Sequence, residues 1–288
     1  MARVCVVGSV NMDLTFDVNA LPRPGETVLA SSLTYAPGGK GGNQAVAAAR
    51  AGASVQFVGA LGDDPAAEQL RTHLSVNGVG LDGTIAVHGP SGTAIIVVDA
   101  AAENTIVVAP GANGRLMLAG AARSVITGCD VLLTQLEIPV PTAVAGARAA
   151  RSAGAVVMVN ASPAGQDQSS LAELASVADV VIANEAEADE WPWRPTYLVT
   201  TLGARGASCV SADDEFWVPA PAVKAVDTTG AGDVFAGVLA ANWPRHPGVR
   251  AERLRALQCA CAAAALSTLV AGAGDCAPDA AAIEAALR

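Results

Sequence analysis

The sequence predicts a Rossmann-like, three-layer α/β/α sandwich, in which helices cover both faces of a mostly parallel sheet. Short β-prone apolar runs alternate with alanine-rich segments of helical length, which is the pattern of parallel strands joined by helical crossovers. The runs are almost continuously apolar, as in strands that are buried on both faces. With 288 residues, of which 52% are hydrophobic and 15% charged, the chain can form one large domain with a sizeable core.

The elements of the predicted sandwich can be assigned in chain order. The first strand is Arg3 to Val10, RVCVVGSV, and the alanine-rich segments Asn43 to Ala51, Pro65 to Asn77 and Pro141 to Ala153 are predicted as helices. The other predicted strands are VQFVGA from Val55, DVLLTQ from Asp130, AVVMVN from Ala155, DVVIAN from Asp179 and YLVTTLG from Tyr197.

Polar residues stand at the ends of most of the predicted strands. In open α/β sheets a ligand binds in the crevice at the carboxyl ends of the strands. We therefore expect the polar side chains at these ends to face one shared site. They are Asn11, Gln135, Asn160, Asn184 and Thr201.

Two segments interrupt the alternation and are predicted to form a small β-sheet lid. Leu14 to Tyr35 has no strong helical pattern, and Thr84 to Val108 has the pattern of a hairpin, with TAIIVVD and TIVVAP on either side of AAAEN. A sheet this small cannot bury both faces, so it is expected to cover the crevice, to pair with another subunit, or both. The predicted core is 1–13, 38–83 and 110–288, and the predicted lid is 14–37 and 84–109.

Charge and cysteine content exclude several classes of protein. The formal net charge is −10 and no basic tract occurs, which argues against nucleic acid and anionic membranes as partners. The apolar start of the chain is too short for a signal peptide, and the longest alanine-rich segment is too short to span a membrane, so a soluble cytoplasmic protein is expected. The six cysteines form no CxxC pair, which indicates reduced thiols rather than a zinc site.

Two motifs near the start of the chain offer polar groups to a ligand. In GSVNMD, Asn11 and Asp13 could hydrogen-bond to a polyol, although both residue types also end strands as ordinary turn residues. In PGGKGGNQAVAAA, glycines allow close approach of the backbone to a ligand, and Lys40 lies in a tight loop before a helix that starts near Asn43. The alternative is a plain glycine-rich turn, but the presence there of one of only two lysines favours function.

Two motifs later in the chain are candidates for binding a nucleotide. TTLGARG, from Thr200 to Gly206, is equally compatible with a turn between strands and with a loop around a nucleotide. DTTGAGDVF, from Asp227 to Phe235, lacks the Lys of the Walker pattern. Successive N–H groups from Gly230 to Gly232 and the helix dipole could form an anion hole without it, and a plain helix N-terminus is the alternative.

Taken in this order, GSVNMD, GGKGGN, TLGARG and DTTGAGD resemble the ribokinase-like (pfkB) family of carbohydrate and nucleoside kinases. The resemblance runs from about Val4 to the C-terminus, and between Gly8 and Asp64 it is closest to the ribokinases. It implies ATP-dependent phosphorylation of D-ribose at the 5-hydroxyl, which gives ribose 5-phosphate and ADP. The alternatives are a kinase of adenosine or another nucleoside, of deoxyribose or of fructose, and a sugar sensor without catalytic activity.

The resemblance implies a sugar site and a catalytic base. By similarity Asp233 is the base that accepts the proton of the sugar hydroxyl, and its place at a helix N-terminus is expected to keep it ionised. The polar character of the set favours a free sugar over a nucleoside, whose base requires an apolar pocket. The residues expected to hold the sugar are Asn11, Asp13, Gly39, Lys40, Asn43, Glu137 and Asp233.

The resemblance also implies a site for ATP with Mg²⁺. By similarity Asn184 and Glu187 of NEAE organise Mg²⁺ and the phosphates through water. Two departures put the nucleotide side in question: WPWRP (Trp191 to Pro195) shortens the chain before Thr200, and Cys261 replaces a frequent His or Asn near the adenine. The remaining residues expected at ATP are Thr201, Leu202, Gly203, Ala204, Arg205, Gly206, Gly230, Ala231 and Gly232.

A monovalent cation, K⁺, and a homodimer joined through the lid strands are further implications of the resemblance. Cys276 stands where the family usually has Ser, and sulfur is a poor ligand for a hard cation, which puts the K⁺ dependence in question. The ligands expected by similarity are Asp227, Thr229, Ser267, Val270, Gly272 and Cys276.

Overall fold

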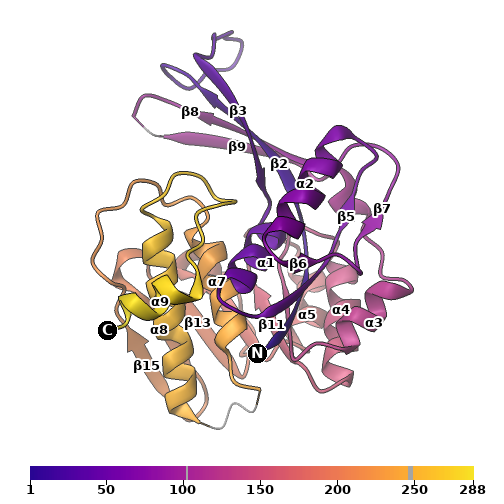
Figure 1. Ribbon diagram of the computed structural model, residues 1–288, viewed down its shortest axis with the longest axis vertical. Helices are drawn as coiled ribbons and strands as arrows, with labels where there is room; N and C mark the ends of the chain where they lie inside the picture. Colours follow the sequence, from indigo (N-terminus) through magenta and orange to yellow (C-terminus); the bar gives the residue numbers. More distant parts are fainter. Residues whose placement is uncertain (102, 246–248) are drawn as a thin grey trace.

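A nine-stranded sheet forms the centre of the computed structural model, which describes residues 1–101, 103–245 and 249–288 (Figure 1). Its strands are β1 (Arg3–Val7), β4 (Ser54–Val58), β6 (Val79–Gly80), β10 (Val131–Thr134), β11 (Val156–Asn160), β12 (Val180–Asn184), β13 (Tyr197–Thr201), β14 (Ala207–Val210) and β15 (Glu215–Val218). The order is β15-β14-β13-β12-β11-β10-β1-β4-β6, and only the pairs β13–β14 and β14–β15 are antiparallel. The predicted fold class is therefore confirmed.

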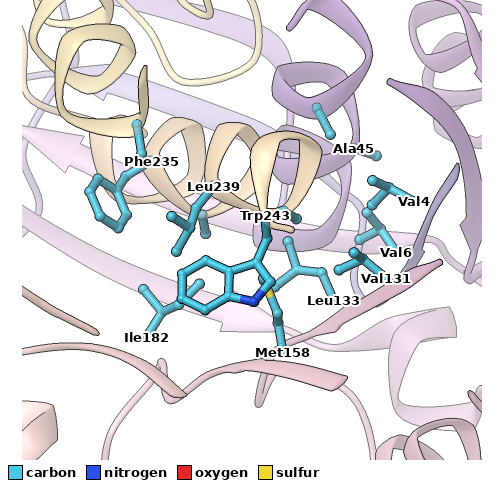
Figure 2. Packing of buried hydrophobic residues seen from close by; sticks show 14 of the residues in the cluster. Val4, Val6, Ala45, Val131, Leu133, Met158, Ile182, Phe235, Leu239 and Trp243 are labelled. Atoms are coloured by element: carbon cyan, nitrogen blue, oxygen red, sulfur yellow. The ribbon is translucent and has the colours of Figure 1, made fainter. Parts of the chain in front are cut away.

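Helices cover both faces of this sheet, and a hydrophobic core lies on each face. Figure 2 shows part of the first core, where Trp243, Phe235 and Leu239 pack over Met158 and Ile182. The first face carries α1 (Lys40–Arg50), α2 (Pro65–Val76), α7 (Ala231–Asn242) and α8 (Arg250–Ser267), with α9 (Ala280–Ala286) packed on α8. The second face carries α3 (Ala121–Thr127), α4 (Val140–Ser152) and α5 (Gln168–Ala175), and α6 (Glu185–Asp189) follows β12.

The first helix begins at Lys40, three residues before the predicted start near Asn43. Glycine is a poor helix former, so the sequence alone favoured a loop over Gly41 and Gly42. In the structure these glycines are helical, and the helix passes very close to the backbone of Ser9, which follows β1. A Cβ on Gly41 would lie 2.6 Å from the carbonyl oxygen of Ser9, so a side chain cannot be accommodated there.

The two interrupting segments form a separate four-stranded sheet that projects from the core (Figure 1). Its strands are β2 (Asn11–Asp17), β3 (Ser32–Gly38), β8 (Gly92–Val98) and β9 (Asn104–Ala109), in the order β3-β2-β8-β9. Ala102, in the predicted hairpin turn, lies outside the described residues. The short strands β5 (Ala60–Leu61) and β7 (Ile85–Ala86) pair separately, and the exact division into core and lid stays a prediction. Within the described ranges, no helix has the length and apolarity needed to cross a membrane.

Candidate active site

Asp233 lies in the first turn of α7 and is 8% exposed. The helix begins after Gly230, whose φ of 79° is in the left-handed region that favours glycine. Asn43 donates from Nδ2 to one carboxylate oxygen of Asp233 at 3.1 Å, and Gln44 donates from Nε2 to the other at 3.0 Å. Two residues of α1 therefore fix the orientation of the predicted base.

Gln44 joins this base to the central strands, and it was not among the predicted site residues. Its Nε2 also donates to Asn160 Oδ1 at 3.0 Å, and its Oε1 accepts from Gln135 Nε2 at 2.8 Å. Gln135 and Asn160, at the ends of β10 and β11, thus meet in one network as predicted from their strand-end positions. The available sequence signal for Gln44 was its place directly after Asn43 in GGNQ.

Burial raises the pKa of Asp233 above its ordinary value. The positive charge of Lys40 and the amide donors Asn43 and Gln44 lower the pKa, and nearby Glu137 raises it, but burial is the largest influence. The prediction that the helix N-terminus keeps this group ionised is therefore opposed by desolvation, which disfavours the charged form. The physical consequence is a more basic carboxylate at this position.

Asp13 lies on β2 against the backbone of Gly38. A Cβ on Gly38 would lie 2.0 Å from Asp13 Oδ2, so glycine is required for this close contact. Burial raises the pKa of Asp13 to about 7, and the negative charges of Glu137 and Asp233 add to this effect. Asp13 Oδ1 is buried and has no hydrogen-bond partner among the described residues.

Lys40 is the first residue of α1 and the positive group among these carboxylates. Burial alone would lower the pKa of Lys40, but the negative charges of Asp233, Glu137 and Glu187 outweigh it and raise the pKa. The backbone N–H of Lys40 donates to Glu137 Oε2 at 3.2 Å. Ser9 Oγ donates to the same oxygen at 2.5 Å, so Glu137 ties the start of α1 to the end of β1.

Asn11 and Gly39 complete the predicted sugar residues. Asn11 is 2% exposed, and its Oδ1 accepts a hydrogen bond from Asn113 Nδ2 at 2.8 Å. Gly39 precedes α1 with φ 84°, and a Cβ there would lie 2.7 Å from the backbone nitrogen of Asn11. Asn113 also bonds to both backbone groups of Val10, so it fixes the start of β2 although the sequence analysis did not single it out.

A cavity of about 180 Å³ joins the predicted base to the predicted nucleotide residues. It lies at the carboxyl ends of β11, β12 and β13, as expected for an α/β sheet. Lys40, Asp233, two glycines of the predicted anion hole and two residues of the NEAE motif therefore line the same cavity. The lining residues are Lys40, Asn160, Ser162, Ile182, Ala183, Asn184, Glu187, Thr201, Gly230, Gly232 and Asp233.

Asn184 and Glu187 form a reciprocal capping box at the start of α6. Asn184 Oδ1 accepts from the N–H of Glu187 at 2.8 Å, and Glu187 Oε2 accepts from the N–H of Asn184 at 2.9 Å. This gives the Asn-x-x-Glu spacing a local structural reason. Each carboxylate or amide oxygen keeps lone-pair capacity for a further ligand, and both residues line the cavity.

The TLGARG motif forms the tight connection between the antiparallel strands β13 and β14. A short 3₁₀ helix spans Gly203–Arg205, and the N–H of Leu202 donates to the carbonyl of Gly206 at 2.8 Å. Arg205 pairs with Glu185 at 2.6 Å on the surface. The segment is a turn, but Thr201 also lines the cavity, so the turn lies beside the predicted phosphate site.

The DTTGAG turn presents the predicted anion hole and borders the predicted cation site. The N–H of Ala231 already donates to the carbonyl of Thr228 at 3.2 Å. Asp227 accepts from the N–H groups of Thr229 at 2.8 Å and Gly272 at 2.9 Å. Burial alone would raise the pKa of Asp227, but these hydrogen bonds outweigh it and hold the pKa below its ordinary value.

The remaining predicted cation ligands are partly engaged with one another. Cys276 Sγ lies 3.3 Å from the carbonyl of Ala273 and 4.0 Å from that of Thr229. The carbonyl of Ser267 accepts from the N–H of Val270 at 3.2 Å. Burial raises the pKa of the Cys276 thiol, which favours the protonated form. The side chain is then a weak S–H donor and does not offer the hydroxyl oxygen that Ser would supply to a cation.

Each departure on the nucleotide side has a buried side chain, Trp191 in WPWRP and Cys261 on α8. Trp191 is buried, and its ring lies edge-on to Trp193 with centroids 5.2 Å apart, whereas Pro192 and Arg194 are exposed. Cys261 on α8 is also buried, with Sγ 3.9 Å from the carbonyl of Val218.

Comparison with known proteins places this site in a family. Residues 1–280 match the pfkB family carbohydrate kinase domain. The chain belongs to this family of carbohydrate kinases. The predicted family and the predicted ATP-dependent kinase activity on a carbohydrate are therefore confirmed.

Individual relatives of this pfkB kinase are ribokinases. It is 38% identical over 248 residues to the ribokinase of Bacillus subtilis (strain 168), covering 82% of this chain and 83% of that protein. It is 33% identical over 265 residues to a bifunctional ribokinase/ribose-5-phosphate isomerase A of Fructilactobacillus sanfranciscensis, covering 84% of this chain but only 48% of that protein. The structure of Arabidopsis thaliana ribokinase complexed with ribose and ATP matches with a TM-score of 0.88 at 27% identity, over 100% of this chain and 99% of that one.

Proposed function

We propose that this pfkB kinase transfers the γ-phosphoryl group of ATP to the 5-hydroxyl of D-ribose, giving ribose 5-phosphate and ADP. The observation that carries the proposal is Asp13 Oδ1, which is buried without a hydrogen-bond partner among the described residues. Buried polar atoms are nearly always paired, so an unpaired oxygen beside other polar groups indicates a ligand donor. A sugar hydroxyl supplies that donor, and the ribokinase relatives support ribose as the sugar.

Asp233 is the group that accepts the proton in the proposed reaction. As the hydroxyl oxygen bonds to the γ-phosphorus, the bond from phosphorus to the ADP oxygen breaks and the hydroxyl proton passes to the carboxylate. Burial raises the pKa of Asp233 and so makes it a stronger base. Asn43 and Gln44 hold its two oxygens, so the base is oriented before the substrates bind.

The charge of the phosphates is balanced by several groups of this chain. The Lys40 ammonium lines the cavity, and the N-terminus of α7 contributes the positive end of the helix dipole. Mg²⁺ bound with ATP would neutralise phosphate oxygens. Asn184 and Glu187 would hold it through water, since hard oxygen ligands suit this ion and their oxygens keep free lone pairs.

The turn from Thr201 to Gly206 is proposed to contact the ATP that lies over the cavity. Gly203, Ala204 and Arg205 are exposed, and Gly203 and Gly206 adopt positive φ values of 58° and 100°. A K⁺ ion is proposed beside Asp227, whose depressed pKa keeps the carboxylate charged. The Cys276 thiol, with Sγ 4.0 Å from the Thr229 carbonyl, competes for one of the oxygens that such an ion requires.

The lid sheet is proposed to join two copies of the chain. Three consecutive side chains of its edge strand β9 are exposed, Ile106, Val107 and Val108, and Tyr35 on β3 is also exposed. An edge strand with exposed apolar residues is a template for pairing with another chain. A second copy is the occupant that we propose, and we place the protein in the cytoplasm, where its buried free cysteines remain thiols.

The test is an ADP-release assay on purified protein with ATP, Mg²⁺ and K⁺. Ribose, deoxyribose, fructose and adenosine are compared by kcat/KM, and ribose is expected to give the highest value. A higher value for another acceptor would replace ribose in the proposal. If no acceptor releases ADP above background while calorimetry detects ribose binding, the chain is a sensor and the proposed function is wrong.

A further inference from the structure

The loop from Ala273 to Ala277, between α8 and α9, lies directly against the DTTGAG turn (Asp227 to Gly232). This turn is proposed to bind the phosphates and is called the phosphate-binding turn below. A Cβ on Gly230 would lie 2.8 Å from the Cα of Ala273, so no side chain separates the two backbones. Cys276 of the loop is 4.0 Å from the carbonyl of Thr229 in the same turn. A displacement of this loop would therefore change the position of the residue that starts α7.

The same loop also contacts the base of the lid. A Cβ on Gly274 would lie 2.2 Å from the carbonyl oxygen of Pro37, which belongs to β3. Pro37 directly precedes Gly38, the glycine that packs on Asp13. The loop therefore lies between two elements: the phosphate-binding turn, which Ala273 and Cys276 contact, and strand β3, which Gly274 contacts.

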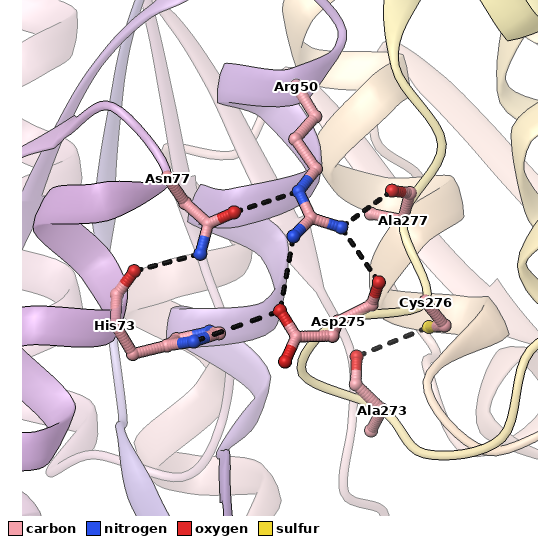
Figure 3. Close-up of polar contacts among 7 residues, drawn as sticks. All are labelled: Arg50, His73, Asn77, Ala273, Asp275, Cys276 and Ala277. Carbon is pink, nitrogen blue, oxygen red and sulfur yellow. Dashed lines mark hydrogen bonds and ion pairs between the residues drawn. The ribbon is translucent and has the colours of Figure 1, made fainter.

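Arg50 forms several hydrogen bonds with this loop, as Figure 3 shows. Its Nη1 donates to the carbonyls of Asp275 at 2.7 Å and Ala277 at 2.9 Å. Its Nη2 donates to Asp275 Oδ1 at 3.1 Å, and its Nε donates to Asn77 Oδ1 at 2.8 Å. Asn77 is itself fixed through Nδ2 to the carbonyl of His73 at 2.8 Å, so the guanidinium links three segments.

The bonding pattern makes Arg50 more than a surface charge. Its side chain is 26% exposed, and two of its hydrogen-bond partners are backbone carbonyls. A lysine ammonium, which is a point charge on a flexible stem, would not bind these carbonyls in a fixed geometry. The planar fork of the guanidinium defines both distance and direction toward the loop. Loss of the side chain leaves the carbonyls of Asp275 and Ala277 without these donors.

Helix α1 connects the guanidinium of Arg50 to the proposed catalytic base, Asp233. Asn43 and Gln44 near its start hold Asp233, and Arg50 is its last residue. At about 1.5 Å per residue, the ten steps from Lys40 to Arg50 span about 15 Å. One rigid helix therefore sets the base at one end and the loop behind the anion hole at the other.

We propose that Arg50 is a positioning residue that holds the loop from Ala273 to Ala277 against the phosphate-binding turn and so aligns the anion hole with Asp233. The proposal rests on the proposed kinase function of the site. Because alignment errors of about 1 Å can cost about 10²-fold in rate, the expected effect lies in phosphoryl transfer and nucleotide binding rather than in sugar binding.

Arg50→Ala is expected to lower kcat at least about tenfold and to weaken Mg–ADP binding, measured by calorimetry, about fivefold. The Kd for sugar without nucleotide is expected to stay within about twofold, because Asp13, Lys40 and Glu137 do not contact Arg50 in the described hydrogen bonds. Arg50→Lys is expected to give an intermediate loss, because one ammonium cannot reach all the acceptors of the guanidinium. Arg148→Ala, which removes an exposed ion pair of 3.2 Å with Glu173, is the matched control and should retain both values.

The outcomes separate this inference from the proposed function. If Arg50→Ala folds with unchanged kcat and ADP affinity and only a lower Tm, Arg50 is merely structural and the inference is wrong. If the alanine variant does not fold, the same two measurements, kcat and ADP affinity, are made on Arg50→Lys. If the unmodified protein shows no kinase activity, the proposed function fails, and ADP affinity alone then decides for or against Arg50.

Discussion

The sugar end and the nucleotide end of the site differ in how their polar groups are satisfied before substrates bind. At the sugar end, the negative charges of Glu137 and Asp233 act on both Asp13 and Lys40, and Asp13 Oδ1 has no partner among the described residues. At the nucleotide end, polar side chains already have partners: Asn184 and Glu187 accept from backbone N–H groups in the capping box, and Arg205 pairs with Glu185 on the surface. The sugar end is thus under electrostatic strain that a ligand relieves, whereas the nucleotide end is stable on its own.

The largest expected effect is the loss of kcat on substitution of Asp233, the proposed base, which lies between the sugar end and the nucleotide end of the site. Asp233→Asn removes the proton acceptor, so kcat should fall about 10³-fold, within the range of general-base contributions. Ribose affinity by calorimetry should stay within about threefold, because the amide keeps the shape of the side chain. Asp167→Asn, which changes an exposed N-cap carboxylate bonded to Ser170, is the control and should keep kcat. Retention of full turnover in Asp233→Asn would contradict the mechanism.

The second prediction tests the strain at the sugar end. Asp13→Asn should raise the KM for ribose about 10- to 100-fold, since hydrogen bonds to a charged group contribute about 1.5–3 kcal/mol. The same change should stabilise the fold at alkaline pH. The folded pKa of Asp13 is raised from 3.8 to about 7, so the folded state binds the extra proton between these values. The contribution of Asp13 to wild-type stability therefore falls as pH rises from about 4 to about 7, by up to about 4 kcal/mol.

Thermal unfolding at pH 5 and pH 8 measures this effect. The Tm of Asp13→Asn should exceed the wild-type Tm by more at pH 8 than at pH 5. An equal difference at both pH values would show that the Asp13 carboxyl is not under strain, and the comparison between the two ends would lose its physical basis.

A smaller effect is expected at the nucleotide end. Arg205→Ala opens the exposed pair with Glu185 and loosens the turn from Thr201 to Gly206, so the KM for ATP should rise about two- to threefold, as expected for a surface pair. The KM for ribose should not change. Glu185→Ala, which removes the other partner, should have the same effect on ATP. If only the KM for ribose changed, the turn from Thr201 to Gly206 would belong to the sugar end of the site rather than to the nucleotide end.

The smallest effect is expected at the cation site. Cys276→Ser replaces an S–H group with a hydroxyl oxygen that a hard cation prefers. The K⁺ concentration for half-maximal activation should fall about twofold or less, and the rise in Tm on replacing Na⁺ by K⁺ should increase. If neither the activation nor the Tm responds differently from the wild type, the side chain at this position does not reach the cation.

The fold class and the gathering of strand-end residues could be predicted because they depend on local patterns. Strand-end positions of Gln135 and Asn160 were enough to place both at the crevice, because parallel strands end at one edge. The start of α1 was predicted too late, because glycine disfavours a helix and the local sequence does not contain the close contact with Ser9 that requires glycine at Gly41.

The roles of Gln44 and Arg50 could not be predicted for a related reason. Each acts through a partner far along the chain, Gln44 on Asp233 at a separation of 189 residues and Arg50 on Asp275 at 225. Nothing in GGNQ or in the alanine-rich run before Arg50 specifies those partners. The influence of burial on the pKa of Asp233 was missed because helix position is visible in sequence, whereas burial by segments far along the chain is not.

The hydrogen bonds of Asp233 to Asn43 and Gln44 also bear on how the protein is made. They span 190 and 189 residues, so the base and the groups that orient it are synthesised far apart in time. A chain still emerging from the ribosome has no assembled site until α7 docks on α1, and such non-local pairing is intrinsically slow. Recovery of enzymatic activity during refolding should therefore lag behind the recovery of secondary structure and report on completion of the native state.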